Sequence, residues 1–405
     1  MGCFHEDFAK MTAETARQFE ALEAQATRIM GVFTLAGHEA VAPAIIQPAG
    51  VFLDGIGEAL RARTYVFTDH DGAELCLRPD LTVPTCRLHL ERVADPSTPA
   101  KYCYNGAAFR YQPATADAAA HPREFRQAGI ESFGNTNAIE AETETLATMI
   151  AALEAAGLDR KALHLRFGDL SLMRALLDAV DMPQRWRHRL QAQFWRPQAF
   201  RAELKRLTED PARLMKALPS RLVQELRAAA PGTSDAIVAA HLDAEGKEQF
   251  GARTVREVAE SILSVIQDSR SPPLAAASKA LIEAYVAINI PCKQAAPAIA
   301  ALAKSAYINL AAPLAKFNER LERFAAHGVN LDAATFSGEF GRSLEYYTGF
   351  VFEIGAPGQP KLSPIAGGGR YDGLMRLAGS AHDVPAVGAA IHTERLLAAI
   401  EARAK

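Results

Sequence analysis

The segment that decides the fold reads Glu124-Phe125-Arg126-Gln127-Ala128-Gly129-Ile130-Glu131-Ser132-Phe133. Its apolar and aromatic residues predict a strand, in which successive side chains point to opposite faces. Gln127, Gly129 and Glu131 then share one face, where an amide and a carboxylate flank a residue without a side chain. Such a face is a floor on which a small cationic group can lie, but the same pattern also fits an exposed strand face.

Further strand patterns occur on both sides of this segment. We expect strands within residues 101–111 and 163–168, and again between residues 335 and 354. Helical spacing of apolar residues predicts a helix in the first 30 residues and another over residues 139–156. Strands in two blocks, with helices before and between them, indicate an α+β protein with a mostly antiparallel sheet flanked by helices.

The two strand blocks are separated by a segment of different composition. Between about residues 170 and 330, Ala, Leu, Arg and Glu dominate and strand patterns are hard to find. We interpret residues 170–330 as a helical insertion into one core, whose first part is residues 1–169 and whose second part is residues 331–405. The sequence shows no period of the length typical of solenoid proteins.

Composition excludes several classes of protein. The chain has 405 residues and a net charge of −3, and no run approaches the roughly 18 apolar residues of a membrane helix. Met1–Glu6 lacks the apolar core of a signal peptide, so we expect a cytoplasmic protein without membrane contact. Its 5 cysteines include no C-x-x-C pair, which argues against a disulfide framework and a zinc site. We expect no metal and no cofactor.

The segment Arg185–Arg206 is rich in arginine and contains Trp186, Phe194, Trp195 and Phe200. Aromatic residues among basic ones are found in nucleic-acid-binding proteins. The same pattern fits an amphipathic helix with a solvated basic face. The near-neutral net charge of the whole chain argues weakly against nucleic acid as the main partner.

Other residues carry possible chemistry. Arg110 ends an expected strand, where its guanidinium can hold a carboxylate or phosphate or simply remain solvated. Asp80 lies in a turn before an expected helix and fits either a ligand contact or a helix cap. Glycines 367–369 match neither dinucleotide-binding nor P-loop spacing, so we interpret them as a place where a ligand approaches the backbone closely, although a bulge also fits. Aromatic residues such as Tyr346 and Tyr347 more often lie in the protein core or at its edge than in contact with a ligand.

Taken in order, five segments resemble the catalytic domain of class II histidyl-tRNA synthetases. The matching segments are Arg78–Thr82, Phe109–Tyr111 with Phe125–Gly134, Arg342–Gly349, Ala366–Gly373 and Gly388–Leu396. They resemble, respectively, R-P-E-x-T, motif 2 with its following strand, the histidine-binding R-G-L-D-Y-Y-T-G, A-G-G-R-Y-D-G and motif 3. The resemblance implies a class II synthetase-like core.

The sequence also departs from the synthetase pattern. Asp80 replaces a glutamate, Gln112 stands in place of an acid after F-R-x, and Ser343 replaces a glycine. His392 begins the segment that replaces G-L-E-R, which puts an imidazole where the family leaves room beside ATP. The sequence ends soon after Arg395, so we expect no anticodon-binding domain and consider tRNA an unlikely partner.

A synthetase-like core in which several residues of the nucleotide site are replaced resembles the regulatory subunits of ATP phosphoribosyltransferase. That resemblance implies a non-catalytic chain that dimerises, joins a short-form catalytic subunit and carries feedback inhibition by histidine in histidine biosynthesis. It implies a histidine-like pocket formed by Asp80, Thr82, Arg110, Gln127, Glu131, Arg342, Tyr346, Tyr347, Gly368 and Tyr371. Arg110 and Arg395 would be remnants of a nucleotide site.

Two other functions remain open on the sequence. An active adenylate-forming enzyme, either a truncated synthetase or an amino-acid ligase, fits the presence of both Arg110 and Arg395. A nucleic-acid-binding module that uses residues 185–206 is the third alternative.

Overall fold

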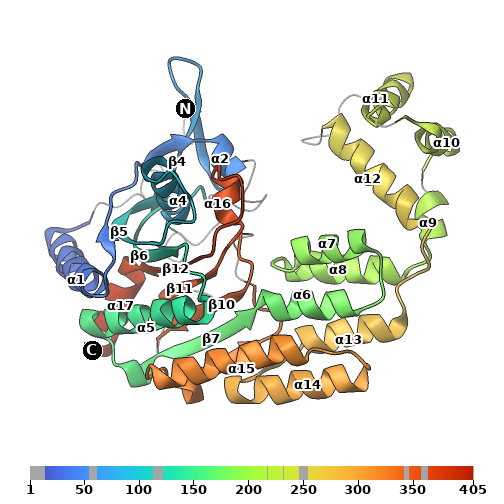
Figure 1. The fold of residues 1–405 in the computed structure, drawn as a ribbon. Helices are drawn as coiled ribbons and strands as arrows, with labels where there is room; N and C mark the ends of the chain where they lie inside the picture. The colour runs from blue at the N-terminus through green and yellow to red at the C-terminus, as the bar shows by residue number, and fades with distance from the viewer. Residues whose placement is uncertain are drawn as a thin grey trace. The chain divides into compact units, whose positions relative to one another are not determined.

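The computed structural model describes residues 14–53, 62–112, 122–216, 218–230, 232–245, 254–341, 346–356 and 364–404. The chain forms two compact units (Figure 1). The first unit comprises residues 1–176 and 284–405, and the second comprises Leu177–Glu283. The candidate site lies in the first unit.

A nine-stranded sheet forms the centre of the first unit, in the order β1-β5-β6-β12-β11-β10-β7-β9-β8. All neighbouring strands are antiparallel except the parallel pairs β1/β5 and β7/β9. The strands are β1 (Glu39–Ala40), β5 (Ala100–Phe109), β6 (Glu124–Phe133), β7 (His164–Asp169), β8 (Asn289–Pro291), β9 (Ala334–Ser337), β10 (Phe350–Gly355), β11 (Ala366–Arg370) and β12 (Ala386–His392). This architecture confirms the predicted α+β class with a mostly antiparallel sheet.

The middle of the sheet joins segments that are far apart in the sequence. Strand β6 pairs with β12, and β10 pairs with both β7 and β11. The glycine run at 367–369 belongs to β11 rather than to a loop. Its backbone lies very close to β12, because a Cβ placed on Gly368 would lie 2.2 Å from the carbonyl oxygen of Gly388. The absence of side chains here therefore serves strand packing.

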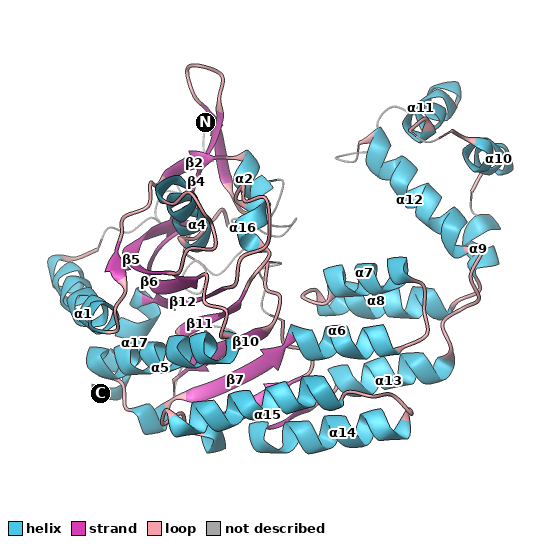
Figure 2. Cartoon of the chain, in the orientation of Figure 1, coloured by secondary structure: helices cyan, strands magenta, loops and turns pink. Residues whose placement is uncertain are grey.

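Helices cover the large sheet (Figure 2). They include α1 (Ala16–Leu35), α5 (Ala138–Ala156), α14 (Ala295–Ser305), α15 (Ala311–Ala326) and α17 (Thr393–Ala404). Helix α1 buries Leu22, Ala26, Ile29 and Phe33, whose spacing of three to four residues places them on one helical face. Thr15 caps this helix through a capping box with Gln18. No helix within the described ranges is long and apolar enough to cross a membrane.

A buried ion-pair network holds α5, α15, β7 and β11 together. Glu142 of α5 accepts hydrogen bonds from Arg320 Nε at 2.6 Å and from Arg370 Nε. Arg320 also donates to Asp169 Oδ2 at 2.7 Å, and Arg370 donates to Asp372 Oδ1 at 2.8 Å. Buried charges are tolerated only when they are paired in this way.

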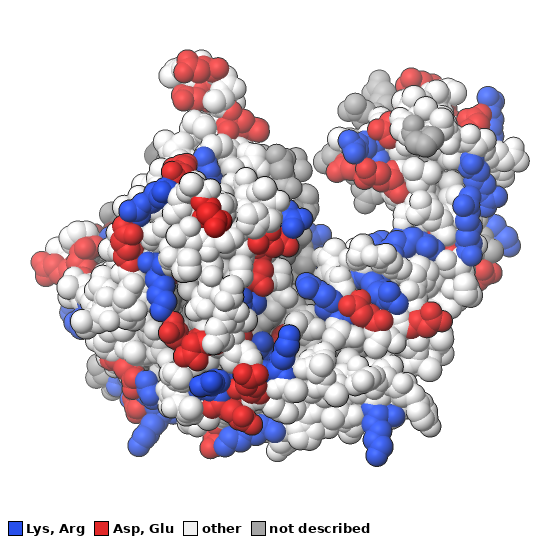
Figure 3. All heavy atoms as spheres, in the orientation of Figure 1, with Lys and Arg blue, Asp and Glu red and all other residues white. Residues whose placement is uncertain are grey.

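A small antiparallel sheet in the first unit has the order β2-β4-β3. Its strands are β2 (Ile46–Pro48), β3 (Tyr65–Thr68) and β4 (Glu74–Leu77), and it is followed by helix α4 (Thr82–Arg92). Two short helices, α2 (Gly50–Leu53) and α16 (Leu374–Leu377), also belong to this unit. Acidic side chains cover the tip of the β3–β4 hairpin, where Asp69 and Asp71 lie (Figure 3).

The second unit is helical over its described residues. Its helices are α7 (Gln184–Gln193), α8 (Pro197–Thr208), α9 (Pro211–Lys216), α10 (Ser220–Ala228), α11 (Ser234–Ala244) and α12 (Val255–Asp268), and helices α6 (Leu170–Ala179) and α13 (Ala276–Val286) connect it to the first unit. The unit is shorter than the helical segment 170–330 expected from the sequence. Residues 284–330 pack with the first unit because β8 joins the edge of the large sheet and α15 carries Arg320 into the ion-pair network.

Candidate functional site

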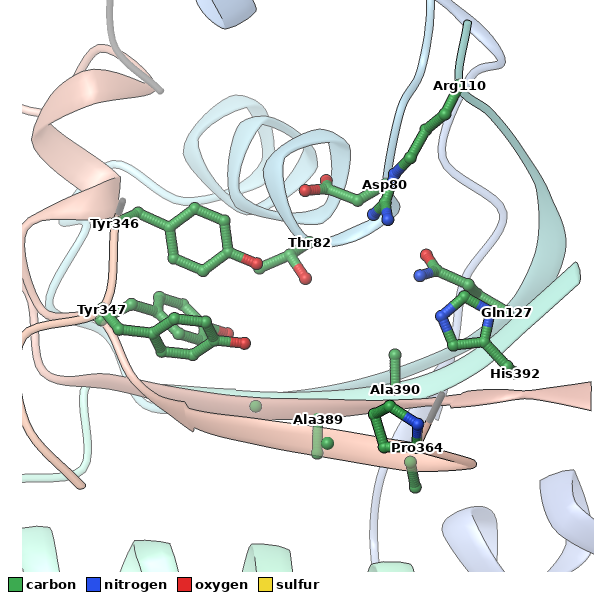
Figure 4. Close-up of a pocket in the computed structure, with 14 residues that line it drawn as sticks. Asp80, Thr82, Arg110, Gln127, Tyr346, Tyr347, Pro364, Ala389, Ala390 and His392 are labelled. Atoms are coloured by element: carbon green, nitrogen blue, oxygen red, sulfur yellow. The ribbon is translucent and has the colours of Figure 1, made fainter. Parts of the chain in front are cut away.

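A cavity of about 60 Å³ opens on the face of β6, β12 and β11 that also carries α4 (Figure 4). This volume holds several water molecules, at roughly 10–15 Å³ for each. The lining residues come from six separate parts of the chain: Asp80, Thr82, Arg110, Gln127, Tyr346, Tyr347, Pro364, Ala366, Gly367, Tyr371, Gly388, Ala389, Ala390 and His392. In Figure 4, Tyr346 and Tyr347 lie on one side of the cavity, and Gln127 and His392 lie on the other.

Asp80 lies just before α4 and is only 3% exposed. Its Oδ1 accepts a hydrogen bond from the Val83 amide at 3.2 Å, which satisfies one of the free amides at the helix start. Its Oδ2 is buried and finds no hydrogen-bond partner within the described part of the chain. Burial raises the pKa of Asp80, although the charge of Arg110 opposes this shift. Asp80 is therefore both a helix cap and a cavity residue.

Gln127 on β6 lies directly opposite His392 on β12. The Gln127 side chain is 5% exposed, and its Oε1 is buried without a hydrogen-bond partner among the residues that the structure describes. An unsatisfied buried acceptor costs about 1–3 kcal/mol, so two of them in one cavity need an explanation. Asp80 and Gln127 together favour a ligand that brings N–H donors to this cavity.

Glu131 is completely buried behind the cavity and is not one of its lining residues. Tyr104 donates to Glu131 Oε1 at 2.9 Å, and Tyr371 donates to Oε2. The carboxylate occupies space that Gly388 leaves open, because a Cβ on Gly388 would lie 1.7 Å from Oε2. Burial raises the pKa of Glu131 to about 7, against the hydrogen bonds from Tyr371, Thr82 and Tyr104.

The expected floor above Gly129 is occupied by a tyrosine of the same chain. Tyr104 lies directly opposite Gly129 on the neighbouring strand β5. A Cβ on Gly129 would lie 2.6 Å from the Tyr104 phenol oxygen, so the ring passes over the glycine. The interpretation of Gly129 as an open ligand floor is therefore wrong: cross-strand packing of Tyr104 requires the glycine.

Three tyrosines form the opposite wall of the cavity. The rings of Tyr346 and Tyr347 are 4.8 Å apart, and Tyr371 packs edge-on against both at 5.6 and 6.2 Å. Each of the three side chains is at most 7% exposed. Edge-to-face packing of this kind fixes ring orientation and adds to the stability of the wall.

The remaining end of the cavity is cationic. Arg110 Nε donates to the Pro79 carbonyl oxygen at 2.9 Å, and its guanidinium carbon lies 4.9 Å from the centre of the Phe125 ring. Arg395 on α17 donates to the carbonyl oxygen of Pro364, a lining residue, at 3.1 Å. Burial lowers the pKa of Arg395. Both arginines thus lie close to the cavity.

The structure brings together most of the residues that the sequence analysis named. Those that line the cavity are Asp80, Thr82, Arg110, Gln127, Tyr346, Tyr347 and Tyr371. Glu131 lies behind the lining, Gly368 packs against β12, and Arg342 falls outside the described residues. Tyr104 could not be identified from the sequence, because its position opposite Gly129 follows only from the pairing register of β5 and β6.

The basic aromatic stretch Arg185–Arg206 is used in packing within the second unit. Asp268 accepts hydrogen bonds from Arg185, Trp186, Arg189 and Arg206 at distances of 2.6–3.0 Å. Phe194 and Phe200 are buried and pack edge to face at 5.7 Å. These contacts account for the pattern without a nucleic-acid ligand.

A metal site is not evident in the ranges that the structure covers, which contain no group of three or more His, Cys, Asp or Glu residues placed to hold an ion. The buried thiols also lack a sign of reactivity, since burial raises the pKa of Cys76 and of Cys103 to about 11.

The fold and the cavity place the chain in the histidyl-tRNA synthetase class. A family model described as histidyl-tRNA synthetase matches residues 11–267 and 234–396. A solved structure from Bacillus halodurans, titled as an ATP phosphoribosyltransferase regulatory subunit/histidyl-tRNA synthetase, is similar with a TM-score of 0.66 and 20% identity over 96% of this chain and 82% of that one. Histidyl-tRNA synthetase from a Nostoc species has a TM-score of 0.58 and 16% identity over 95% of this chain and 72% of that one. These two likenesses concern the fold alone.

Sequence identity to curated proteins identifies the family within this class. The ATP phosphoribosyltransferase regulatory subunit of a Chelativorans species is 34% identical over 87% of this chain and 91% of its own length. The protein of the same name from Mesorhizobium japonicum is 33% identical over 95% of this chain and 99% of its own length. The chain belongs to the family of ATP phosphoribosyltransferase regulatory subunits.

Proposed function

We propose that this chain is a non-catalytic subunit that a short-form ATP phosphoribosyltransferase catalytic subunit needs for the first step of histidine biosynthesis. We propose further that it carries feedback inhibition by histidine. Family membership supports the first part. The observation that supports the second is the pair of buried acceptors, Asp80 Oδ2 and Gln127 Oε1, which belong to two residues that line one small cavity.

Histidine matches this cavity chemically. Its α-ammonium group and its imidazole supply N–H donors for Asp80 and Gln127, while Thr82 offers a hydroxyl beside them. Its carboxylate would face Arg110, and Tyr346 and Tyr347 would pack against the ring. Glu131 would act from behind by holding the hydroxyls of Tyr104 and Tyr371. A site built from such matched polar groups rejects analogues that lack them.

Self-association through the small sheet is part of the proposal. Ile45 and Ile46, at the start of β2, and Val66 and Phe67, on β3, are 38–52% exposed. An apolar surface of this kind on a sheet edge favours pairing with a second copy of the chain. Light scattering at micromolar concentration tests this, and a strictly monomeric protein would contradict it.

Reconstitution tests the main proposal. The purified chain is mixed with a short ATP phosphoribosyltransferase catalytic subunit, and turnover of ATP with phosphoribosyl pyrophosphate is measured with and without histidine. We expect turnover to require this chain and to fall as histidine is added. Turnover that is independent of this chain would overturn the proposal.

The second candidate is an adenylate-forming enzyme, which is favoured by the position of Arg110 and Arg395 beside the cavity. Histidine-dependent exchange of pyrophosphate into ATP separates the two functions. A regulatory subunit gives no exchange, whereas robust exchange by the purified chain would establish the enzyme.

A further inference from the structure

Two of the three tyrosines in the cavity wall belong to the segment 346–349, which is joined to the start of a helix. The amide of Leu170, the first residue of α6, donates to the Gly349 carbonyl oxygen at 3.0 Å. The residue after this glycine, Phe350, pairs with Asp169 at the end of β7. The tyrosine wall and the beginning of α6 are therefore connected by backbone contacts, although they are far apart in the sequence.

Asp169 connects the start of α6 to the buried ion-pair network. Its Oδ1 accepts hydrogen bonds from the amides of Ser171 and Leu172 at 2.8 and 3.3 Å, so it caps the N-terminus of the helix. Its Oδ2 accepts a hydrogen bond from Arg320 Nη1 at 2.7 Å. The side chain is buried, at 4% exposure. One carboxylate thus serves both the helix start and the network.

The network leads from Arg320 back to the same cavity wall. Arg320 Nε donates to Glu142, which also accepts a hydrogen bond from Arg370. Arg370 directly precedes Tyr371 in β11, and its carbonyl oxygen accepts from the Thr348 amide at 2.8 Å. All three wall tyrosines are therefore close in sequence to groups that are held by this network or by α6.

Helix α6 begins directly where β7 ends (Figure 1). The helix runs over Leu170–Ala179, so it continues past Leu176, where the first unit ends in this part of the chain, into the second unit. Parting a buried ion pair leaves a charge uncompensated and is strongly destabilising. A shift of the tyrosine wall is thus expected to move the start of α6 with it rather than to break the contact at Asp169.

We propose that Asp169 and Arg320 are positioning residues that couple the tyrosine wall of the cavity to the start of α6. A ligand that packs against the wall then favours one position of α6, and this position of α6 favours the ligand by the same factor. Occupation of the cavity is thereby communicated to a helix that leads into the second unit. The identity of the ligand rests on the proposed function, whereas the coupling of wall and helix does not.

Hydrogen exchange of the full-length chain, followed by mass spectrometry, tests the coupling at the amides of residues 171–176. Saturating histidine is added to the parent, Asp169→Asn and Arg320→Lys. Asparagine keeps an acceptor for the capped amides without the charge that pairs with Arg320, and lysine lacks the planar fork that spans Glu142 and Asp169. We expect histidine to slow exchange at these amides about fivefold or more in the parent and to leave it unchanged in both variants.

Two controls separate the coupling from general stabilisation by a ligand. Exchange in α14, which contributes no residue to the ion-pair network, should not slow with that of residues 171–176. Arg160→Lys changes an arginine whose ion pair with Glu154 is partly exposed on both sides, and it should behave as the parent does. Circular dichroism checks folding, and Arg320→Lys replaces Asp169→Asn if the latter is unfolded.

A measurement without ligand tests the coupling apart from histidine. Tyr347→Ala removes one ring of the wall, and it should speed exchange at residues 171–176 about fivefold or more in the parent background but not in Asp169→Asn. Calorimetric titration shows separately whether histidine binds. If histidine does not bind, the proposed function fails and the Tyr347→Ala comparison alone decides the coupling.

Four results would overturn the proposal. These are bound histidine that leaves residues 171–176 unchanged in the parent, equal slowing in the parent and the two network variants, equal slowing in α14, and an equal effect of Tyr347→Ala in both backgrounds.

Discussion

Asp268 in the second unit and Asp80 beside the cavity are almost equally buried, at 2% and 3% exposure, but their partners differ. Asp268 accepts four hydrogen bonds, three of them from arginines. Burial alone would raise its pKa, but the hydrogen bonds from Arg185, Trp186 and Arg189 outweigh burial and the pKa is lowered. In contrast, burial dominates at Asp80, where the pKa is raised and one oxygen lacks a partner in the described structure.

This difference separates a structural carboxylate from one that awaits a ligand. Removal of either partner of a fully paired buried charge is strongly destabilising, because the other charge is left uncompensated. A buried acceptor without a partner lowers stability, and it persists where a ligand supplies the missing donor. On this criterion the ion pairs around Asp268 hold helices together, whereas Asp80 and Gln127 mark a binding site.

The largest expected effect is that of Asp268→Ala, which leaves three arginines without their shared carboxylate. Breaking a buried ion pair from one side costs about 3–5 kcal/mol, and we expect a loss of free energy of unfolding of this size in urea. Glu225→Ala is the control, since its ion pair with Arg221 is exposed and contributes less than about 1 kcal/mol. A loss below about 1 kcal/mol for Asp268→Ala would remove the distinction between the two carboxylates.

Asp80→Asn tests the second carboxylate of the comparison, the one beside the cavity. Asparagine keeps an acceptor for the Val83 amide but removes the charge that we expect to meet the ammonium group of histidine. Losing one partner of a buried charged pair costs about 2–5 kcal/mol, which is at least roughly 30-fold in Kd. The ligand-free variant should be as stable as the parent or more so, because it removes a buried charge whose second oxygen lacks a hydrogen-bond partner in the described structure.

Calorimetric titration with histidine and thermal unfolding measure the two effects of Asp80→Asn. The parent should gain about 2.7 kcal/mol at a histidine concentration of 100 times Kd. Asp71→Asn, at an exposed position on the β3–β4 hairpin, is the matched control. Histidine binding by Asp80→Asn with the affinity of the parent would show that the carboxylate is not a ligand contact.

Gly388→Ala tests whether the space behind the cavity is reserved for a carboxylate. The added Cβ would lie 1.7 Å from Glu131 Oε2, whereas a Cβ on Gly355 of β10 meets no atom within 4 Å. Overpacking typically costs about 1–3 kcal/mol, so we expect that loss for Gly388→Ala and close to none for Gly355→Ala. Equal unfolding midpoints for the two variants would contradict the tight packing around Glu131.

The sequence predicted strand β6 with its observed bounds, because its apolar and aromatic residues Phe125, Ile130 and Phe133 are a local signal that needs no tertiary information. It could not predict β11, since glycine disfavours strands and only the close approach of β12 explains Gly368. The residue at which the helical insertion ends could not be predicted from the sequence either. Amphipathic helices α14 and α15 resemble those of the second unit. Tertiary contacts place them in the first unit, namely the pairing of β8 with β9 and the ion pair of Arg320 with Asp169.

The candidate site shows the same limit. Asp80 and Gln127 could be named from motif positions, but each also fitted an ordinary cap or strand face. Their unsatisfied oxygens are what distinguish them, and these depend on which atoms surround them in the fold. The position of Glu131 behind Tyr104 and Tyr371, rather than in the cavity lining, likewise requires the pairing register of three strands.

The smallest expected effect concerns the pH dependence of stability, which Glu131→Gln isolates. The pKa of Glu131 is about 7 in the folded chain, compared with a usual value of 4.5. Between these two values the folded state holds a proton that the unfolded state has released. The contribution of Glu131 to stability is therefore complete below pH 4.5 and is lost as the pH rises towards 7, by roughly 1 kcal/mol per pH unit.

Glutamine does not titrate, so the free energy of unfolding of the parent should fall relative to that of Glu131→Gln from pH 5 to pH 7. Urea unfolding of both proteins at half-unit pH steps measures this difference, in which the other titrating groups cancel. A difference that stays constant with pH, or that changes in the opposite direction, would mean that Glu131 is ionised throughout, as a paired carboxylate like Asp268 would be.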